Sequence, residues 1–189
     1  DKMYFPGWGG NTQYETFGGV TDASGTHYLQ LDFDVNNELT GKPSPVSVLA
    51  EATVIDVNRQ GWTGETTLLV HPASLYVGLR SDKYFVERGT PLVVEAIVTD
   101  LDGNAIADRP VEIQAARMEW KFVSGEWQEE AVDVQTCSVG SASEPVTCTF
   151  ETNVGGKYRI TAVVTDKEGR QNLSEITRWV SGGEIPPAR

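Results

Sequence analysis

The chain has 189 residues and carries 15 Lys and Arg against 27 Asp and Glu, which gives a formal net charge of −12 at pH 7. This acidity argues against nucleic acid as a partner, because phosphate contacts need Lys and Arg, and it disfavours an anionic membrane surface. Hydrophobic residues make up 39% of the chain, enough to form a core rather than a disordered segment. No run of about 18 apolar residues is present, so no membrane-spanning helix is predicted. We therefore expect a soluble, acidic chain of one or two domains that works outside the cytoplasm.

Apolar and polar residues alternate along most of the chain, which is the period of a half-buried β-strand. Leu29, Leu31 and Phe33, for example, would share one face of a strand. No segment has the 3.6-residue period of an amphipathic helix. The expected strands are at about 14–20, 27–35, 46–57, 65–71, 75–80, 91–99, 110–122, 127–138, 145–151, 157–165 and 171–180. The predicted fold class is therefore all-β, as tandem immunoglobulin- or fibronectin-like antiparallel β-sandwiches.

The strand count divides the chain unequally. Residues 75–183 contain seven expected strands, enough for a complete sandwich, whereas residues 1–74 contain about four and are interpreted as the C-terminal part of a β-domain. Residues 184–189, with two consecutive prolines, are interpreted as the start of a linker to a next domain in a larger protein. A partial domain exposes apolar surface and sheet edges, so we expect it to favour self-association.

A turn of the form Thr-Asp-x-x-Gly occurs three times, at 21–25, 99–103 and 165–169. The glycine can adopt the positive φ that a tight turn requires, and Asp is common in β-turns of every kind. The stretch from Asp100 to Asn104 also resembles the start of a calcium loop, but Val111 stands where a bidentate acid is needed. A turn is therefore the preferred interpretation, and no metal site is predicted.

The two cysteines, Cys137 and Cys148, would flank a hairpin, where their Cβ atoms could meet at disulfide distance. An even count in an extracytoplasmic chain favours a bond between them. The alternative is two free thiols in a reducing compartment. A zinc site would need further ligands, and only His27 and His71 remain to join them, both in the other part of the chain.

No combination of residues predicts an enzyme. His27 begins an expected strand and His71 precedes a proline, so each has a plain structural interpretation. Glu129 and Glu130 are interpreted as solvated strand charges rather than as a pair of catalytic carboxylates. No Gly-x-Ser-x-Gly elbow and no phosphate-binding glycine motif is present. We expect no catalytic residue and no cofactor.

Trp120, Phe122 and Trp127 flank the expected Ser124-Gly125 turn. Such residues commonly pack as cross-strand pairs, and Trp120 and Trp127 are candidate interface residues toward a neighbouring domain. The other interpretation is an exposed aromatic platform for carbohydrate.

Residues 75–91, from Leu75 through Asp82-Lys83 to Gly89-Thr90-Pro91, resemble the opening of a macroglobulin domain. The turn at 99–103, the stretch Gly155–Ala162 and the close at Trp179-Val180-Ser181-Gly182 also resemble such domains in bacterial alpha-2-macroglobulins. Gly19–Gly25 and Ala50–Gln60 look like the second half of a preceding domain of this kind. The resemblance covers essentially the whole chain and rests on structural turn signatures.

The resemblance implies a scaffold fragment of a bacterial, periplasmic or cell-surface protease-trapping inhibitor. Its expected partners are the neighbouring macroglobulin domains and, through the full-length protein, target proteases. Many such proteins carry a Cys-x-x-Gln thioester, but Cys137 and Cys148 are not followed by this pattern, so no thioester residue is assigned here. In this scaffold, Phe85, Tyr158 and Trp179 are expected to serve the core. The alternative function is a cell-surface immunoglobulin-like adhesion or carbohydrate-binding module.

Overall fold

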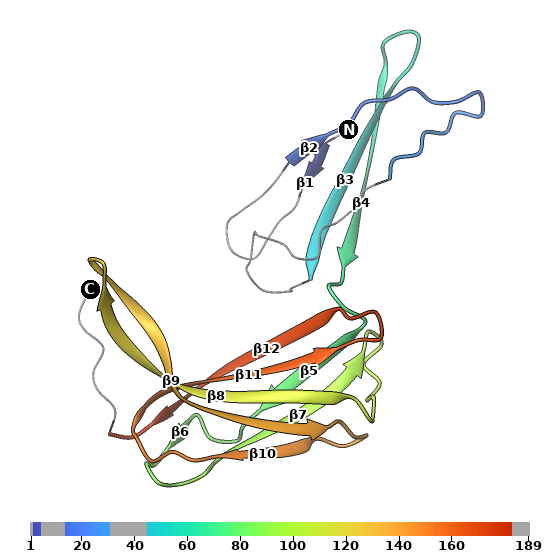
Figure 1. Ribbon diagram of the computed structural model, residues 1–189. Coiled ribbons are helices and arrows are strands. Elements are labelled where there is room, and N and C mark those ends of the chain that lie inside the picture. Colours follow the sequence, from blue (N-terminus) through green and yellow to red (C-terminus); the bar gives the residue numbers. More distant parts are fainter. Residues whose placement is uncertain (1, 5–13, 31–44, 183–189) are drawn as a thin grey trace. The chain divides into compact units, whose positions relative to one another are not determined.

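The computed structural model describes residues 2–4, 14–30 and 45–182, and within these ranges all regular structure is β-strand (Figure 1). The predicted all-β, antiparallel class is thus confirmed. The chain divides into two compact units, residues 1–72 and 73–189. The division follows Pro72, two residues before the boundary predicted from the strand count. In the described ranges no helix is long and apolar enough to cross a membrane.

Unit 1 contains one four-stranded sheet with the order β2-β1-β3-β4. Its strands are β1 (Lys2–Tyr4), β2 (Tyr14–Thr16), β3 (Val46–Ile55) and β4 (Gly61–Val70). In the β3–β4 hairpin Val48 is fully buried, whereas Ile55 and Trp62 are 67% and 72% exposed.

Three strand predictions in unit 1 are wrong in extent. Residues 27–30 form no strand, and the remainder of the predicted 27–35 strand lies outside the described residues. The strand predicted at 14–20 ends at Thr16, because Phe17 is followed by two glycines that pack little side-chain surface. β4 starts at Gly61 rather than at 65, because the tight turn before it brings Gly61 directly opposite Ile55.

Unit 2 is a two-layer sandwich. Its strands are β5 (Leu75–Arg80), β6 (Phe85–Val86), β7 (Leu92–Asp100), β8 (Pro110–Val123), β9 (Glu126–Gly140), β10 (Val146–Phe150), β11 (Gly156–Thr165) and β12 (Gln171–Val180). One sheet has the order β10-β7-β5 and the other β6-β12-β11-β8-β9. All pairs are antiparallel except β6 with β12, which is parallel.

The core of unit 2 follows the period of two. Every second residue of β7 and β11 is buried, and these side chains meet between the sheets. The buried cluster consists of Leu75, Val77, Val86, Leu92, Val94, Ala96, Val98, Val111, Ile113, Ala115, Cys148, Phe150, Tyr158, Ile160, Ala162, Val164 and Val180. Tyr158 was expected in this core, and it is only 2% exposed. The expectation for Phe85 is wrong: its side chain is 73% exposed, because Val86 is the β6 residue that points inward. Trp179 is half-buried.

Side chains join the two sheets at both of their edges. At one edge, Asn172 of β12 accepts a hydrogen bond from the Val77 amide at 3.0 Å, and the Ser174 hydroxyl donates to the Val77 carbonyl. At the other edge, the Gln135 side chain binds both backbone groups of Glu151, at 2.8 and 2.9 Å. Backbone groups that a sheet edge would leave open are thereby satisfied. Residues 172–174 have the form Asn-x-Ser of a glycosylation sequence. Asn172 is buried, and both polar side chains of the triplet are engaged within the fold.

Tyr158 forms a tyrosine corner at the start of β11. Its hydroxyl donates a hydrogen bond to the carbonyl of Val154, four residues earlier, at 2.8 Å. This contact is a hallmark of immunoglobulin-like sandwiches, where it fixes the loop that crosses between the sheets.

Replacing Tyr158 by Phe is expected to lower the free energy of unfolding of unit 2 by about 1–2 kcal/mol, because the Val154 carbonyl loses its partner while the ring still fills the core. Calorimetry of the variant should show the lower stability without a change of fold. Tyr84→Phe is the matched control, since that ring is more than half exposed and its hydroxyl lies outside the core. An equal loss in both variants would contradict the role of the corner.

The turn predicted three times is one structure that occurs four times among the described residues. In each copy the Asp carboxylate accepts hydrogen bonds from the amides two and four residues later, as Asp100 does from Asp102 and Asn104. The other copies begin at Asp22, Asp56 and Asp166. The fourth residue has positive φ, and in the Asp56 turn it is Arg59 rather than Gly. That substitution explains why a search for glycine missed the turn. The Asp100 carboxylate binds the backbone amides of its own turn, in agreement with the interpretation of this stretch as a turn rather than a calcium loop.

Candidate interaction site on the β8–β9 arm

The β8–β9 hairpin extends past the sandwich. The last β8 residue paired with β11 is Met118, opposite Lys157, and beyond it β8 and β9 pair only with each other among the described strands. We call residues 117–134 the arm; in Figure 1 it curls away from the sandwich in yellow and gold. Ser124 and Gly125 close it with φ of 53° and 92°, the two positive values that a tight two-residue hairpin loop needs.

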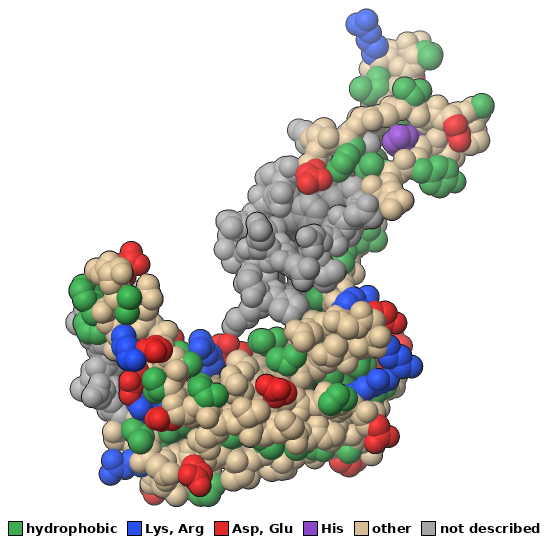
Figure 2. Space-filling view, in the orientation of Figure 1, with side chains coloured by type: hydrophobic (Ala, Val, Ile, Leu, Met, Phe, Trp, Pro, Cys, Tyr) green, Lys and Arg blue, Asp and Glu red, His purple; other side chains and the backbone are tan. Residues whose placement is uncertain are grey.

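One face of the arm is aromatic. Trp120 and Phe122 alternate with polar residues on β8, and Trp127 lies directly opposite Phe122 on β9. The Phe122 and Trp127 rings are 5.4 Å apart and inclined at 60°. Their side chains are 61% and 51% exposed, while Met118, on the same face at the base, is buried. The face therefore begins on the sandwich and ends in exposed rings. Figure 2 shows hydrophobic side chains, in green, on the surface of the arm.

The opposite face of the arm is charged and mainly acidic. Glu119 lies opposite Glu130, a repulsive pair that Arg117 and Lys121 relieve by ion pairs to Glu119 and Glu130. Glu126, beside the turn, has no ion-pair partner among the described residues. Exposed pairs of this kind contribute little to stability, so this face defines a charge pattern more than it holds the arm together.

A β-bulge marks the base of the arm. Between Ala115 and Arg117 the register shifts, and Asp133 of β9 has a φ of 50°. The Arg117 guanidinium binds the Asp133 carboxylate at 2.8 Å and is itself mostly buried. Bulges bend a strand and increase its twist, which accounts for the turn of the arm away from the sheet.

The candidate interface residues Trp120 and Trp127 thus lie on one face of the arm but do not face each other. Trp120 is opposite Glu129, whose carboxylate binds Lys157 at 2.7 Å, and it is half-buried. Phe122, opposite Trp127, is the more exposed ring. The alternation of residues 118–127 indicated this face, but the register of β11 against β8, which decides where the arm becomes free, did not show in the pattern.

The cysteines are joined differently from the hairpin geometry predicted for them. Cys137 and Cys148 form a disulfide with Cα atoms 6.2 Å apart. Cys137, however, lies on β9 in the five-stranded sheet and Cys148 on β10 in the three-stranded sheet. The hairpin expectation is therefore wrong, because β10 pairs with β7 instead of β9. The bond links the two layers of the sandwich next to the Gln135 contact.

The remaining candidate residues stay apart. His27 lies in a non-strand segment, where a Cβ atom on Gly19 would come within 2.2 Å of its ring. His71 precedes the end of unit 1. Within the ranges that the structure describes, no three His, Cys, Asp or Glu side chains gather in a way that could hold a metal ion.

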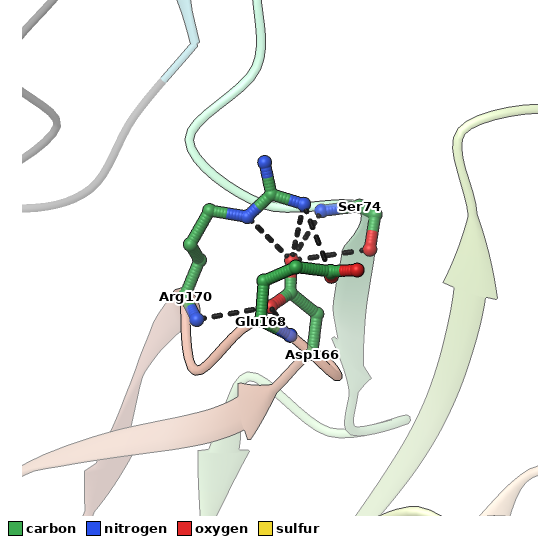
Figure 3. A network of polar contacts seen from close by, with 4 residues as sticks. All are labelled: Ser74, Asp166, Glu168 and Arg170. Carbon is green, nitrogen blue, oxygen red and sulfur yellow. Dashed lines mark hydrogen bonds and ion pairs between the residues drawn. The ribbon is translucent and has the colours of Figure 1, made fainter.

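The most strongly perturbed acid is Asp166, in the β11–β12 turn (Figure 3). Its buried carboxylate accepts bonds from the amide and hydroxyl of Ser74, at 3.0 and 3.1 Å, and from the Arg170 guanidinium. Burial by itself raises the pKa of Asp166, but these hydrogen bonds outweigh it and hold the pKa well below its usual range. Its partners, Ser74 and Arg170, hold the carboxylate in place, so this network anchors the start of β5 to the β11–β12 turn. We interpret it as a structural contact.

Comparisons with known proteins place the chain only at the level of the fold. No family model matches it. A stretch of 107 residues is 29% identical to "Circularly permutated Ras protein 2" of Dictyostelium discoideum, covering 52% of this chain and 3% of that protein. The chain thus spans a small fraction of this curated relative.

Three solved structures share the β-architecture weakly. A Salmonella alpha-2-macroglobulin mutant matches at 15% identity and TM-score 0.44, over 71% of this chain and 10% of that one. Escherichia coli alpha-2-macroglobulin activated by porcine elastase matches at 17% and 0.40, over 77% and 14%. The fibronectin(III)-like modules of Clostridium thermocellum CbhA match at 13% and 0.36, over 100% and 83%. These values describe a weak likeness of fold and carry no conclusion about function.

Proposed function

We propose that the chain is a scaffold segment of a larger extracytoplasmic protein, a bacterial, periplasmic or cell-surface macroglobulin-like inhibitor that traps proteases. In this proposal the arm of unit 2 contacts a neighbouring domain of the parent protein. The single observation that carries it is the arm itself: exposed Phe122 and Trp127 rings on a hairpin that extends from a sandwich closed at both edges.

Two further observations support the proposal. The turn and strand signatures of residues 75–183 resemble those of macroglobulin domains. The disulfide between the layers is typical of an oxidising compartment. A rigid sandwich with an aromatic projection is suited to hold a neighbouring domain in position, because aromatic side chains dominate the binding energy of many protein interfaces.

Protease retention by the full-length parent protein tests this function. Replacing Phe122 and Trp127 by Ser should lower the amount of protease retained by about tenfold or more, the range expected when interface aromatics are truncated. Leu101→Ser, at an exposed turn outside the arm, is the control and should retain protease normally. Undiminished retention in the arm variant would contradict the proposed role of this segment.

The second candidate is an immunoglobulin-like adhesion or carbohydrate-binding module, which the exposure of Trp127 favours. The 60° inclination of Phe122 and Trp127 gives no single flat platform for a sugar ring. A glycan titration separates the two functions. A saturable tryptophan fluorescence change with a glycan, abolished in Trp127→Ala, would replace the scaffold proposal by this one.

A further inference from the structure

The outer edge of β9 in the arm is an open strand. β9 ends the order of its sheet, and no described strand pairs with its outer side. The two-residue loop makes Val123 and Glu126 the hydrogen-bonded closing pair. By alternation, the amide and carbonyl groups of Trp127, Glu129 and Ala131 then point outward, away from β8.

This open edge has definite ends. The loop limits it at Glu126, and the bulge at Asp133 limits it toward the sandwich. Beyond the bulge, Gln135 and the Cys137–Cys148 bond tie the strand to the other sheet. The open part, residues 126–132, is about 20 Å long at the usual rise per residue, enough for a strand of six or seven residues.

The side chains beside this edge define what can pair with it. On one face an added strand would contact Trp127, Ala131 and, between them, Glu129, whose carboxylate is already bound by Lys157. On the other face it would lie beside Glu126, Gln128 and Glu130. Acidic side chains on an edge repel another copy of the same edge, which is a known protection against self-pairing. The same acids attract a strand of opposite charge, and the chain as a whole carries −12.

From this geometry we infer that the arm binds its partner by strand addition along β9, and that the partner is an extended segment in which basic and apolar side chains alternate. The apolar positions pack on the Trp127 face and the basic positions face Glu126 and Glu130. This inference rests on the proposed use of the arm as a protein contact, and it specifies the chemistry of that contact. Backbone hydrogen bonds supply affinity and the alternation supplies selectivity, as in other complexes formed by β-augmentation.

A nine-residue peptide of alternating Lys and Val, labelled with a fluorophore, is the probe for titration into the 189-residue chain. A peptide with the same residues in two blocks is the control for charge alone. Two N-methylated forms of the alternating peptide complete the set, one methylated at the amides that face β9 and the other at the intervening amides. Methylation of the amides that face β9 should weaken binding by about tenfold or more, because it removes several hydrogen bonds. Methylation of the intervening amides should leave the affinity within about threefold.

Variants of the chain test whether the peptide binds along the open edge of β9. Glu126→Gln with Glu130→Gln should weaken the alternating peptide by about three- to tenfold and reduce its salt dependence. Glu112→Gln, an exposed acid of β8 in the sandwich, should not affect binding. Trp127→Ala should weaken binding while the salt dependence persists.

Several results would overturn the inference. They are absence of binding by the alternating peptide, equal binding by the block peptide, equal effects of the two methylation patterns, and dimerisation of the chain in sedimentation that Glu126→Gln strengthens. The last result would assign the edge to a second copy. Peptide binding can fail while the parent protein still loses protease with the Phe122 and Trp127 variant; in that case the arm is a contact but does not use strand addition. Binding without any loss of protease would instead contradict only the scaffold function.

Discussion

Replacing Asp166 by Asn is expected to lower the free energy of unfolding of unit 2 by about 3 kcal/mol at pH 7, because a buried charged acceptor with several donors is removed. The amide of Asn would direct donor hydrogens at Ser74 or Arg170, both of which are already donors. The start of β5 would lose its anchor to the β11–β12 turn. Hydrogen exchange of the buried β7 and β11 amides measures this loss within unit 2, independently of unit 1.

The loss should depend on pH. The pKa of Asp166 is depressed in the folded state. In the unfolded chain the pKa of an Asp side chain is about 3.9. The ionised carboxylate therefore contributes its full stabilisation above that value, and the contribution declines as the pH falls toward the lower folded pKa. The difference between wild type and Asp166→Asn should be constant from pH 8 to about pH 5 and should shrink below about pH 4.

Asp100→Asn is the matched control for this experiment. Asp100 forms the same turn and its pKa is also lowered, first by the side-chain hydrogen bond from Asn104, but it is only half-buried and has no Ser74 or Arg partner. Its replacement should destabilise unit 2 by about 1 kcal/mol or less, the usual effect of an exposed turn or cap contact. Equal effects at the two positions would show that the turn, and not the anchor to Ser74, accounts for the loss.

Removal of the disulfide should have an effect of similar size. Cys137 and Cys148 are 11 residues apart, and closing a loop of that length in the unfolded chain is worth about 3 kcal/mol on the entropic estimate. The double variant to Ala should therefore unfold at a clearly lower urea concentration. Cys148 is buried, so Ala is preferred to Ser, whose hydroxyl would need a partner in the core.

A reductant provides the internal control. Dithiothreitol should lower the urea midpoint of the wild-type chain to near that of the double variant, and it should leave the variant unchanged. A midpoint that is insensitive to both treatments would mean that the Gln135 contacts alone hold this edge of the sandwich.

Most strands of unit 2 could be predicted because its sheets are buried on one side only. Strict alternation in β7 and β11 follows from that arrangement, and the predicted limits differ from the observed ones by a residue or two. β6 was missed because it has two residues and is defined by its pairing with β12, which no local pattern records. Phe85 was predicted to lie in the core as an aromatic residue, but its parallel pairing with Trp179 directs its side chain outward.

The residues of the candidate site could be predicted from the sequence, but their exposure on a projecting arm could not. The aromatic residues around Ser124-Gly125 were identified as an interface or a platform, and the hairpin places them on one face. Their exposure depends on which β8 residue lies opposite the start of β11, and this register of Lys157 with Met118 is not visible in the sequence. The assignment of the cysteines to different sheets, and the closure of both edges by Asn172 and Gln135, likewise arise from contacts between residues distant in sequence.

The parallel pairing of β6 with β12 has a mechanical consequence. Tyr84 and Val86 accept hydrogen bonds from the amides of Trp179 and Ser181, at 3.0 and 2.9 Å. Tension between the two ends of unit 2 reaches β6 through β5, which precedes it and pairs with β7. It then pulls β6 toward its first residue and β12 toward its last, so the parallel strands are drawn in opposite directions along their length. The bonds between them are then loaded together, in shear, instead of opening one after another. A domain that must keep its shape while a larger molecule is pulled or rearranged around it gains resistance to rupture from this one short pairing.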